Sequence, residues 1–175
     1  MTYVVLLRGV NVGGNTRVEM SRLKAILESL GCTDVQTYLN SGNAVCKKAT
    51  KLNATEVEKA IEVEFGFAVP VLVLDANTVC RVAESIPESW RNDDDQKSDV
   101  AFLFPAADDA SIVMKVGCNS DIETGLYVPG ALLWNIERKH QSRGSLPKVV
   151  GTPLYQQMSI RNVNTARKLA ELVQS

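Results

Sequence analysis

The sequence predicts an α/β protein of the α+β kind, made of two tandem ferredoxin-like halves with mainly antiparallel sheets. Short apolar runs typical of buried strands alternate with segments whose apolar residues recur at the spacing of a helix. In the first half their order is strand, helix, strand, strand, helix, strand, which is the βαββαβ arrangement of the ferredoxin-like fold. A similar order begins again after residue 97.

The strands of the first half are marked by their apolar residues and by turn signals between them. The run Tyr3–Leu7 is rich in strand formers, as expected of a central strand. Two further strands, Val35–Leu39 and Ala44–Lys47, flank a predicted hairpin turn at Asn40–Asn43. The fourth strand is Pro70–Leu74, and its proline suits a first position because it donates no hydrogen bond to a neighbouring strand.

Two amphipathic helices connect these strands. In each, apolar residues recur three and four positions apart and so share one face. Gly31 follows the first helix at the position where a left-handed cap is common. The apolar residues concerned are Met20, Leu23, Ile26, Leu27 and Leu30 in the first helix, and Val57, Ala60, Ile61 and Phe65 in the second.

The second half repeats most of this order after a polar break. A helix predicted over Asp75–Glu84 leads into Pro87–Ser98, a segment rich in Asp, Asn and Ser that marks the best candidate boundary. Between the later hairpin and the last strand, Gln141–Val150 is polar with only a weak helical pattern. The other predicted elements are strand Val100–Phe104, helix Ala107–Val116, hairpin strands Gly125–Val128 and Ala131–Ile136, strand Met158–Ile160 and helix Val163–Val173.

The division into halves rests on the order of the elements, because no residue-level repeat accompanies it. Pro129-Gly130 is the predicted turn of the second hairpin, and Asn162 is the predicted N-cap of the last helix. We therefore place the N-terminal half at residues 1–86, the linker at 87–97 and the C-terminal half at 98–175.

Composition and charge bear on which class of ligand the protein binds. The chain has 175 residues, 45% of them hydrophobic, and a formal net charge of −1, which argues against a wholly cationic nucleic-acid binder. Acidic residues concentrate in 88–123 and basic residues in 137–175. Such blocks indicate either a solvated surface or, for the basic one, a patch that attracts phosphates.

The cysteines and the single histidine do not form a metal-binding pattern. The cysteines are Cys32, Cys46, Cys80 and Cys118. None is part of a C-x-x-C pair, and His140 is the only histidine, so neither a zinc site nor a disulfide framework is expected. Asp93–Asp95 lacks the glycine and the spaced glutamate of a calcium loop. We therefore predict no metal and no cofactor, and a reducing, cytoplasmic location.

The opening apolar run also bears on location. Tyr3–Leu7 is too short for a signal peptide or a membrane span, so we expect no membrane partner.

The loop after the first strand is the most informative stretch of the sequence. It reads Arg8-Gly-Val-Asn-Val-Gly-Gly-Asn-Thr16, and its glycines let the backbone come close to a ligand. It nearly fits the phosphate-loop pattern G-x-x-x-x-G-K-[ST], but Asn15 stands where the lysine would contact phosphate. Two interpretations stay open. The loop's N–H groups and Arg8 hold a carboxylate or phosphate, or the glycines make tight turns that Asn11 braces.

Several short motifs together resemble a known family. They are Arg8–Gly14 in the loop, Met20-x-x-Leu23 in the first helix, Ser41-Gly42-Asn43 in the hairpin, and Arg161-Asn162-x-x-Thr165 followed by Lys168-Leu169-x-x-Leu172 near the end. In combination they resemble the bacterial family known as domain of unknown function 1697, over nearly the whole chain. The resemblance implies an α/β arrangement of two ferredoxin-like halves and supplies no catalytic residue. One departure is Val163, where the family usually has tryptophan.

The resemblance and the topology together select the candidate ligand-binding residues. The first and third strands of a βαββαβ unit are antiparallel neighbours, so the loop after Leu7 and the hairpin Asn40–Asn43 lie at the same edge of the sheet. That the segment Arg161-Asn162 meets them is a hypothesis from their joint selection. The candidates are Arg8, Asn11, Gly13, Gly14, Ser41, Asn43, Arg161 and Asn162, with Thr165 as a further motif residue.

These donors suit an anionic ligand and include no general base, nucleophile pair or metal-ligand set. We predict a binding or regulatory module that recognises an anionic small molecule or a phosphate group through the loop Arg8–Gly14. The alternatives are single-stranded nucleic-acid binding, which the few aromatic residues of the first half do not favour, and an enzyme of unknown reaction type. The oligomeric state stays open.

Overall fold

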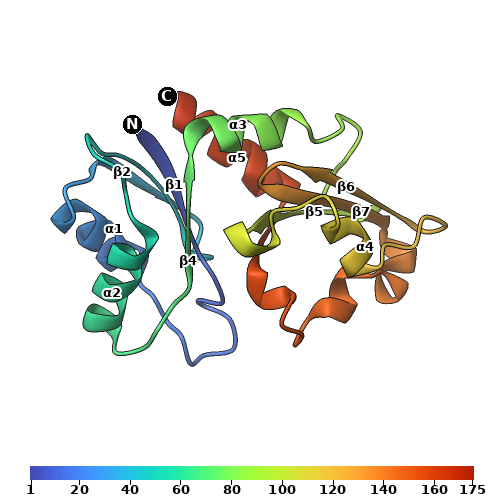
Figure 1. Cartoon of the computed structure of the whole chain (residues 1–175), viewed down its shortest axis with the longest axis horizontal. Coiled ribbons are helices and arrows are strands. Elements are labelled where there is room, and N and C mark those ends of the chain that lie inside the picture. The colour runs from blue at the N-terminus through green and yellow to red at the C-terminus, as the bar shows by residue number, and fades with distance from the viewer. The chain divides into compact units, whose positions relative to one another are not determined.

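The chain forms two compact units. The computed structural model describes residues 1–175, and the units are Met1–Val79 with Leu169–Ser175, and Cys80–Lys168. Each is built on a four-stranded antiparallel sheet, whose strands are labelled in Figure 1. The predicted α+β class with two halves is therefore confirmed. The units do not follow the predicted segments 1–86, 87–97 and 98–175, because residues 80–97 group with the second unit and residues 169–175 with the first.

The first unit has the predicted order of elements. They are β1 (Thr2–Leu7), α1 (Met20–Ser29), β2 (Thr33–Tyr38), β3 (Asn43–Lys47), α2 (Ala54–Phe65) and β4 (Val71–Asp75), and α3 (Ala76–Glu84) follows. The strands lie in the order β2-β3-β1-β4, which is the ferredoxin-like arrangement. Every predicted strand and helix of this unit is found within a few residues of its predicted bounds.

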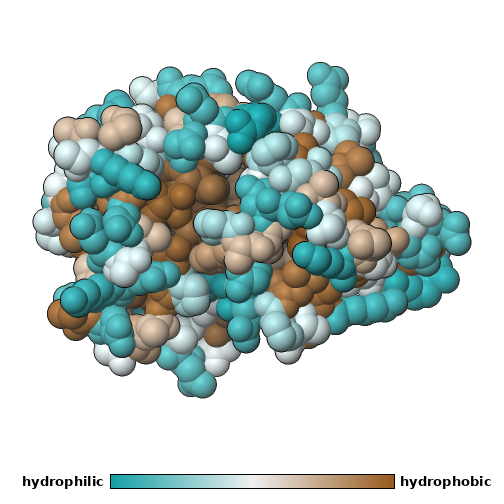
Figure 2. Space-filling model, viewed as in Figure 1, coloured by the Kyte–Doolittle hydropathy of each residue, from teal (hydrophilic) through white to brown (hydrophobic).

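Helices α1 and α2 cover one face of this sheet (Figure 1). The apolar side chains of that face pack against the apolar stripes of both helices, with Val5, Leu27 and Ile61 fully buried among them. Gly31 adopts φ +84° after α1, and its N–H donates to the carbonyl oxygen of Glu28 over 3.0 Å, so the predicted left-handed cap is confirmed. The outer surface of the two helices carries hydrophilic and hydrophobic residues intermixed (Figure 2).

The second unit has the same sheet with a different cover. Its strands are β5 (Gln96–Leu103), β6 (Glu123–Val128), β7 (Ala131–Glu137) and β8 (Met158–Asn162), in the order β6-β7-β5-β8. Its helices are α4 (Ile112–Val116) and the first six residues of α5 (Val163–Gln174). The remaining elements are short 3-10 turns, η1 (Pro105–Ala107), η2 (Arg138–Arg143), η3 (Leu146–Val149) and η4 (Tyr155–Gln157).

Two predicted helical segments of this unit take other forms. The segment predicted as a helix over Ala107–Val116 is helical only from Ile112, because the side chains of Asp108 and Asp109 before it accept hydrogen bonds from other groups. The Asp108 carboxylate accepts hydrogen bonds from the Tyr127 hydroxyl and the Gly130 N–H, over 2.9 and 2.8 Å. The weak helical pattern at 141–150 becomes 3-10 turns, since glycine and proline interrupt it at Gly144 and Pro147.

A buried glutamate fixes those turns to the sheet. Glu123 accepts hydrogen bonds from the indole N–H of Trp134 over 2.8 Å and from the N–H groups of Ser145 and Asn119 over 2.9 and 2.6 Å. Burial opposes ionisation of this carboxyl, but the hydrogen bonds outweigh burial and hold its pKa below its usual range. The carboxylate thus ties β6, β7 and the start of η3 together.

The segment predicted as a linker, residues 87–97, is held within the second unit by two arginines. Arg167 donates to the carbonyl oxygens of Trp90 and Pro87 over 2.9 and 3.1 Å. Arg138 donates through Nε to the carbonyl oxygen of Asp93 over 2.9 Å. Charge-assisted hydrogen bonds of this kind are stronger than those between neutral groups, so the segment is attached along its length.

The strands of the two sheets pair in the same register, so each position of β1 has an equivalent position in β5. The N–H of Leu7 donates to the carbonyl oxygen of Gly42 over 2.8 Å, and that of Leu103 donates to Gly130 over 2.9 Å. Counted back from this pair, Tyr3 of β1 and Asp99 of β5 occupy equivalent positions.

The same register reveals a short repeat that the sequence analysis missed. Tyr3 lies opposite Asp75, and Asp99 lies opposite Asn162. Each of these partners ends its strand and caps the helix that follows. The Asp75 side chain accepts from the N–H of Thr78 over 2.8 Å, and the Asn162 side chain accepts from that of Thr165 over 2.9 Å. The predicted N-cap at Asn162 is therefore confirmed, and Asn-Thr recurs at the same place in both halves.

Candidate functional site

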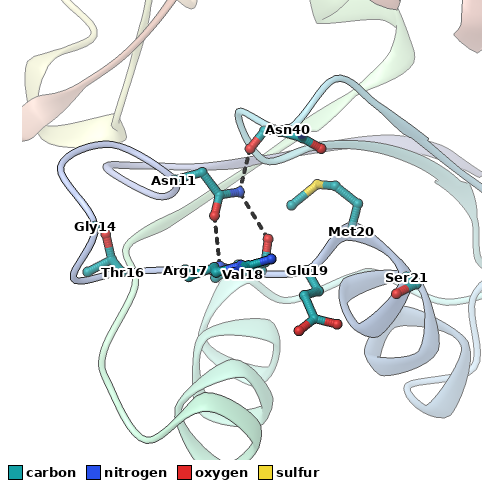
Figure 3. A pocket seen from close by; sticks show the side chains of 9 residues that line it. All are labelled: Asn11, Gly14, Thr16, Arg17, Val18, Glu19, Met20, Ser21 and Asn40. Atoms are coloured by element: carbon teal, nitrogen blue, oxygen red, sulfur yellow. Dashed lines mark hydrogen bonds between the residues drawn. The ribbon is translucent and has the colours of Figure 1, made fainter.

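The loop between β1 and α1 forms one wall of a cavity in the first unit. The cavity has a volume of about 640 Å³ and opens to solvent. Figure 3 shows how the loop, the first turn of α1 and the hairpin tip surround it. Its lining residues are Asn11, Gly14, Thr16, Arg17, Val18, Glu19, Met20, Ser21 and Asn40.

Asn11 braces this loop from within. Its side-chain amide donates to the carbonyl oxygens of Val18 and Asn40, and its side-chain oxygen accepts from the N–H of Val18 over 2.9 Å (Figure 3). The residue itself adopts φ +57°, a conformation that asparagine tolerates better than most residues. The structure thus joins the loop to the hairpin at one edge of the sheet, as the topology predicts.

Some N–H groups of the loop are bonded and others are not. The N–H of Asn11 donates to the carbonyl oxygen of Thr16 over 2.9 Å, and that of Arg8 donates to Pro70 over 3.0 Å. No hydrogen bond of the chain uses the N–H groups of Gly13, Gly14 or Asn15. These three consecutive donors lie where the backbone turns through positive φ at both glycines.

The first turn of α1 adds two more donors of the same kind. The N–H groups of Arg22 and Leu23 both donate to the carbonyl oxygen of Glu19, whereas those of Met20 and Ser21 have no partner in the chain. Because α1 has ten residues, its dipole adds positive potential at this end.

Two charged side chains also line the cavity. Glu19 makes no side-chain cap bond to the helix, and Figure 3 shows its carboxylate directed away from Asn11 and Asn40. Arg17 is exposed and forms no ion pair. The two formal charges balance, so the unbonded N–H groups decide which sign of ligand the cavity favours.

The hairpin residues selected from the sequence are bonded to one another. Asn43 is fully buried, and its side-chain amide donates to the Tyr38 carbonyl oxygen and the Ser41 hydroxyl, each over 2.9 Å. Gly42 has φ +81°, and a Cβ there would lie 2.6 Å from the Cβ of Leu7. Ser41 and Asn43 therefore shape the hairpin that supports Asn40, while Asn40 itself lines the cavity.

Arg8 and the pair Arg161-Asn162 lie outside this cavity lining. Arg8 is half-buried at the end of β1. Arg161 is buried on β8 and donates to the Ile160 carbonyl oxygen over 2.8 Å, and burial lowers its pKa to about 10. It belongs to the second unit with Asn162, so their meeting with the loop stays a prediction.

Sequence reasoning missed Arg17 and Asn40 as lining residues. Arg17 is the last cation before α1, and that position was a usable signal, because a charge just before a helix start lies beside its free N–H groups. Asn40 gave no such signal, since its place in the cavity depends on the bond that its carbonyl oxygen accepts from Asn11.

This arrangement offers main-chain donors and one guanidinium, without an acid–base pair of the kind that catalysis requires. No group of three or more His, Cys, Asp or Glu side chains is placed to hold a metal ion. None of the helices has the length and hydrophobicity needed to cross a bilayer.

Comparisons with known proteins agree with this fold. The chain is similar to a solved structure described as the structure of conserved bacterial protein SP0830 from Streptococcus pneumoniae. The two are 24% identical over 98% of each chain, with a TM-score of 0.79, which shows a shared fold. No curated protein sequence matches the chain. A family model described as "Protein of unknown function (DUF1697)" matches residues 1–134, and the chain therefore belongs to this family.

Proposed function

We propose that the protein is a binding module for a small anionic molecule or phosphate group, held by the loop Arg8–Gly14 and the start of α1. One observation carries this proposal: unbonded N–H groups from both segments border the same open cavity. Its volume of about 640 Å³ suits a small molecule.

The physical reason is the sign of the main-chain dipoles. Each unbonded N–H group presents a partial positive charge, and three follow one another at Gly13–Asn15, of which Gly14 lines the cavity. The start of α1 adds the positive end of a helix dipole. A phosphate or carboxylate accepts several such bonds at once, whereas a cation accepts none.

The aromatic residues of the sheets bear on the nucleic-acid alternative. Stacking of bases on a ferredoxin-like sheet requires exposed aromatic rings on the central strands. Tyr3, Phe102 and Trp134 are all buried. We therefore keep the anionic small molecule as the favoured ligand.

The four cysteines are free thiols. Free thiols are usual in a reducing compartment, which supports our proposal of a cytoplasmic location.

The experiment is a titration of the whole protein with inorganic phosphate, sulfate and short dicarboxylates, read as thermal stabilisation and as NMR shifts of backbone amides. Bound anions should raise the melting temperature and shift the amide signals of Gly13, Gly14 and Ser21. Arg17→Gln should weaken binding about three- to tenfold, because it removes one cation beside the donors. Lys51→Gln is the matched control, since Lys51 is exposed, unpaired and outside the cavity lining.

Equal effects of the two substitutions would show that only net charge matters and would contradict the site. Stabilisation without shifts in the loop amides would also contradict it.

A further inference from the structure

A second cavity, in the other unit, has the features of a separate binding site. It has a volume of about 380 Å³ and lies over β5 and β8. Lys97, Asp99 and Ile160 of the sheet line it, with Leu146 and Tyr155 from the 3-10 turns and Val150 between them.

The cavity is present because turns, and not a helix, complete this side of the unit. In the first unit the twelve-residue helix α2 covers the corresponding part of the sheet with Val57 and Ile61 fully buried. In the second unit Gly144, Pro147 and Gly151 interrupt the connection, and only short turns form there. A covering of short turns leaves space that a continuous helix fills.

A charged pair lies where a core residue belongs. The carboxylate oxygen Oδ2 of Asp99 is 3.0 Å from Nζ of Lys97, and the Asp99 side chain is only 7% exposed. Its register counterpart in the first unit is Tyr3, a core residue. Burying a carboxylate costs free energy even beside a partner, so a charge in this position is more consistent with binding than with stability.

The Asp99 carboxylate has one charged partner, and both groups lie on the wall of the cavity. Its Oδ2 faces Nζ of Lys97, and Lys97 lines the cavity beside it. Burial raises the pKa of Asp99 despite the nearby Lys97. A carboxylate that is almost buried, on the wall of a cavity and beside a single ammonium group, indicates where a ligand donor would bind.

We propose that this cavity binds an uncharged small molecule with an apolar body and an amide-type edge. Asp99 accepts the N–H of that edge, and the ammonium group of Lys97 donates to the adjacent carbonyl oxygen. The charges of the two side chains cancel, so a ligand carrying a net charge gains less than a neutral one that offers both a donor and an acceptor.

The apolar walls take the body of the ligand. Leu146, Pro147 and Ile160 present hydrocarbon surface, and Val150 is 59% exposed at the opening. An exposed valine at the edge of an apolar cavity loses contact with water when a ligand enters, which favours binding. Primary amides, lactams and the amide edges of heterocycles meet these requirements.

The test compares three matched probes on the whole protein by NMR: benzamide, benzoate and benzylamine. They share a ring and differ in the charge and donors of one substituent. Benzamide should bind with a dissociation constant of about 1 mM, as expected for a ligand of its size, and should shift the amide signals of residues 97, 99 and 150. Benzoate and benzylamine should bind at least tenfold more weakly.

Two variants make the test specific. Asp99→Asn should weaken benzamide binding about tenfold, while Asp94→Asn, at an exposed aspartate with the same change in charge, should not. Val150→Trp should block the opening without unfolding the protein, because the side chain it replaces is exposed. Equal binding of all three probes, no saturable benzamide binding, or unchanged binding to Asp99→Asn or Val150→Trp would overturn the proposal.

Discussion

In the first unit the crossover from β3 to β4 is α2, a regular helix with a side-chain cap at Asn53 and a left-handed glycine at Gly66. In the second unit the same crossover, from β7 to β8, consists of 3-10 turns fixed by Glu123. The strand order and the register are the same in both. The sheet therefore specifies the fold, whereas the crossover decides whether the sheet face is covered by a helix or leaves a cavity.

The candidate sites follow this difference. The first unit has a filled core, and its candidate binding cavity lies at the edge of the sheet, where the loop, the hairpin and α1 meet. The second unit has its cavity over the sheet itself. Its loop after β5 offers no comparable set of glycines, because Phe104 and Pro105 lead directly into η1.

The largest expected effect concerns the close approach of β1 to its hairpin. Gly42→Ala should lower the free energy of unfolding by about 3 kcal/mol, because the new Cβ would lie 2.6 Å from the Leu7 Cβ and φ is +81°. Gly66→Ala is the matched control: it has φ +80° but no atom within 4 Å, so it should cost only about 1 kcal/mol. Urea denaturation of both variants measures the difference. Equal losses would mean that backbone strain, and not the contact with Leu7, makes glycine necessary.

A smaller effect tests whether the repeated caps are equivalent. Asp75→Ala and Asn162→Ala should each lower the free energy of unfolding by about 1 kcal/mol, since each removes one side-chain bond to the start of a helix. Asn77→Ala is the control, because Asn77 is exposed and its change should stay within about 0.5 kcal/mol. Thermal and urea unfolding measure the two losses. Unequal losses would mean that the two caps share their geometry but not their contribution to stability.

The smallest effect contrasts Asp99 with its counterpart Tyr3. Because burial raises the pKa of Asp99, its contribution to stability is present below the unfolded pKa and is lost as the pH rises through the folded pKa. Asn stays uncharged, so Asp99→Asn should be more stable than the parent at pH 7, by less than about 1 kcal/mol, and should lose this advantage near pH 3.

The control for that measurement is Tyr3→Phe, which alters no carboxyl group, so its effect should not change over the same range of pH. Unfolding in urea at several pH values provides the comparison. If Asp99→Asn is less stable relative to the parent at pH 7 than at pH 3, the attraction between Lys97 and the Asp99 carboxylate outweighs the cost of burying that carboxylate.

The sequence predicted the sheet, and the reason is local. Apolar runs such as Tyr3–Leu7 and turn residues such as Asn40–Asn43 encode strands and a hairpin without help from distant residues. Only the second half of the predicted helix over Ala107–Val116 forms, because Asp108 binds groups of the hairpin that are distant in sequence. Contacts of this kind leave no periodic signal.

The candidate sites were less predictable than the fold. The loop was identified from its glycines, but the roles of Asn11 and Asn40 depend on one bond between segments 29 positions apart. The pair Lys97 and Asp99 was missed because the predicted strand began at Val100, whereas β5 begins at Gln96. The available signal was the spacing of Asp99, Ala101 and Leu103, which are two positions apart and therefore share one face of a strand.

The attachment of residues 87–97 by Arg138 and Arg167 has a practical consequence for dissecting the protein. A fragment that starts at residue 98 would lack the first two residues of β5 and the carbonyl oxygens that both guanidinium groups bind. The two guanidinium groups would then donate to water in place of these main-chain acceptors. Fragments meant to fold independently should therefore retain this polar segment with the downstream strands.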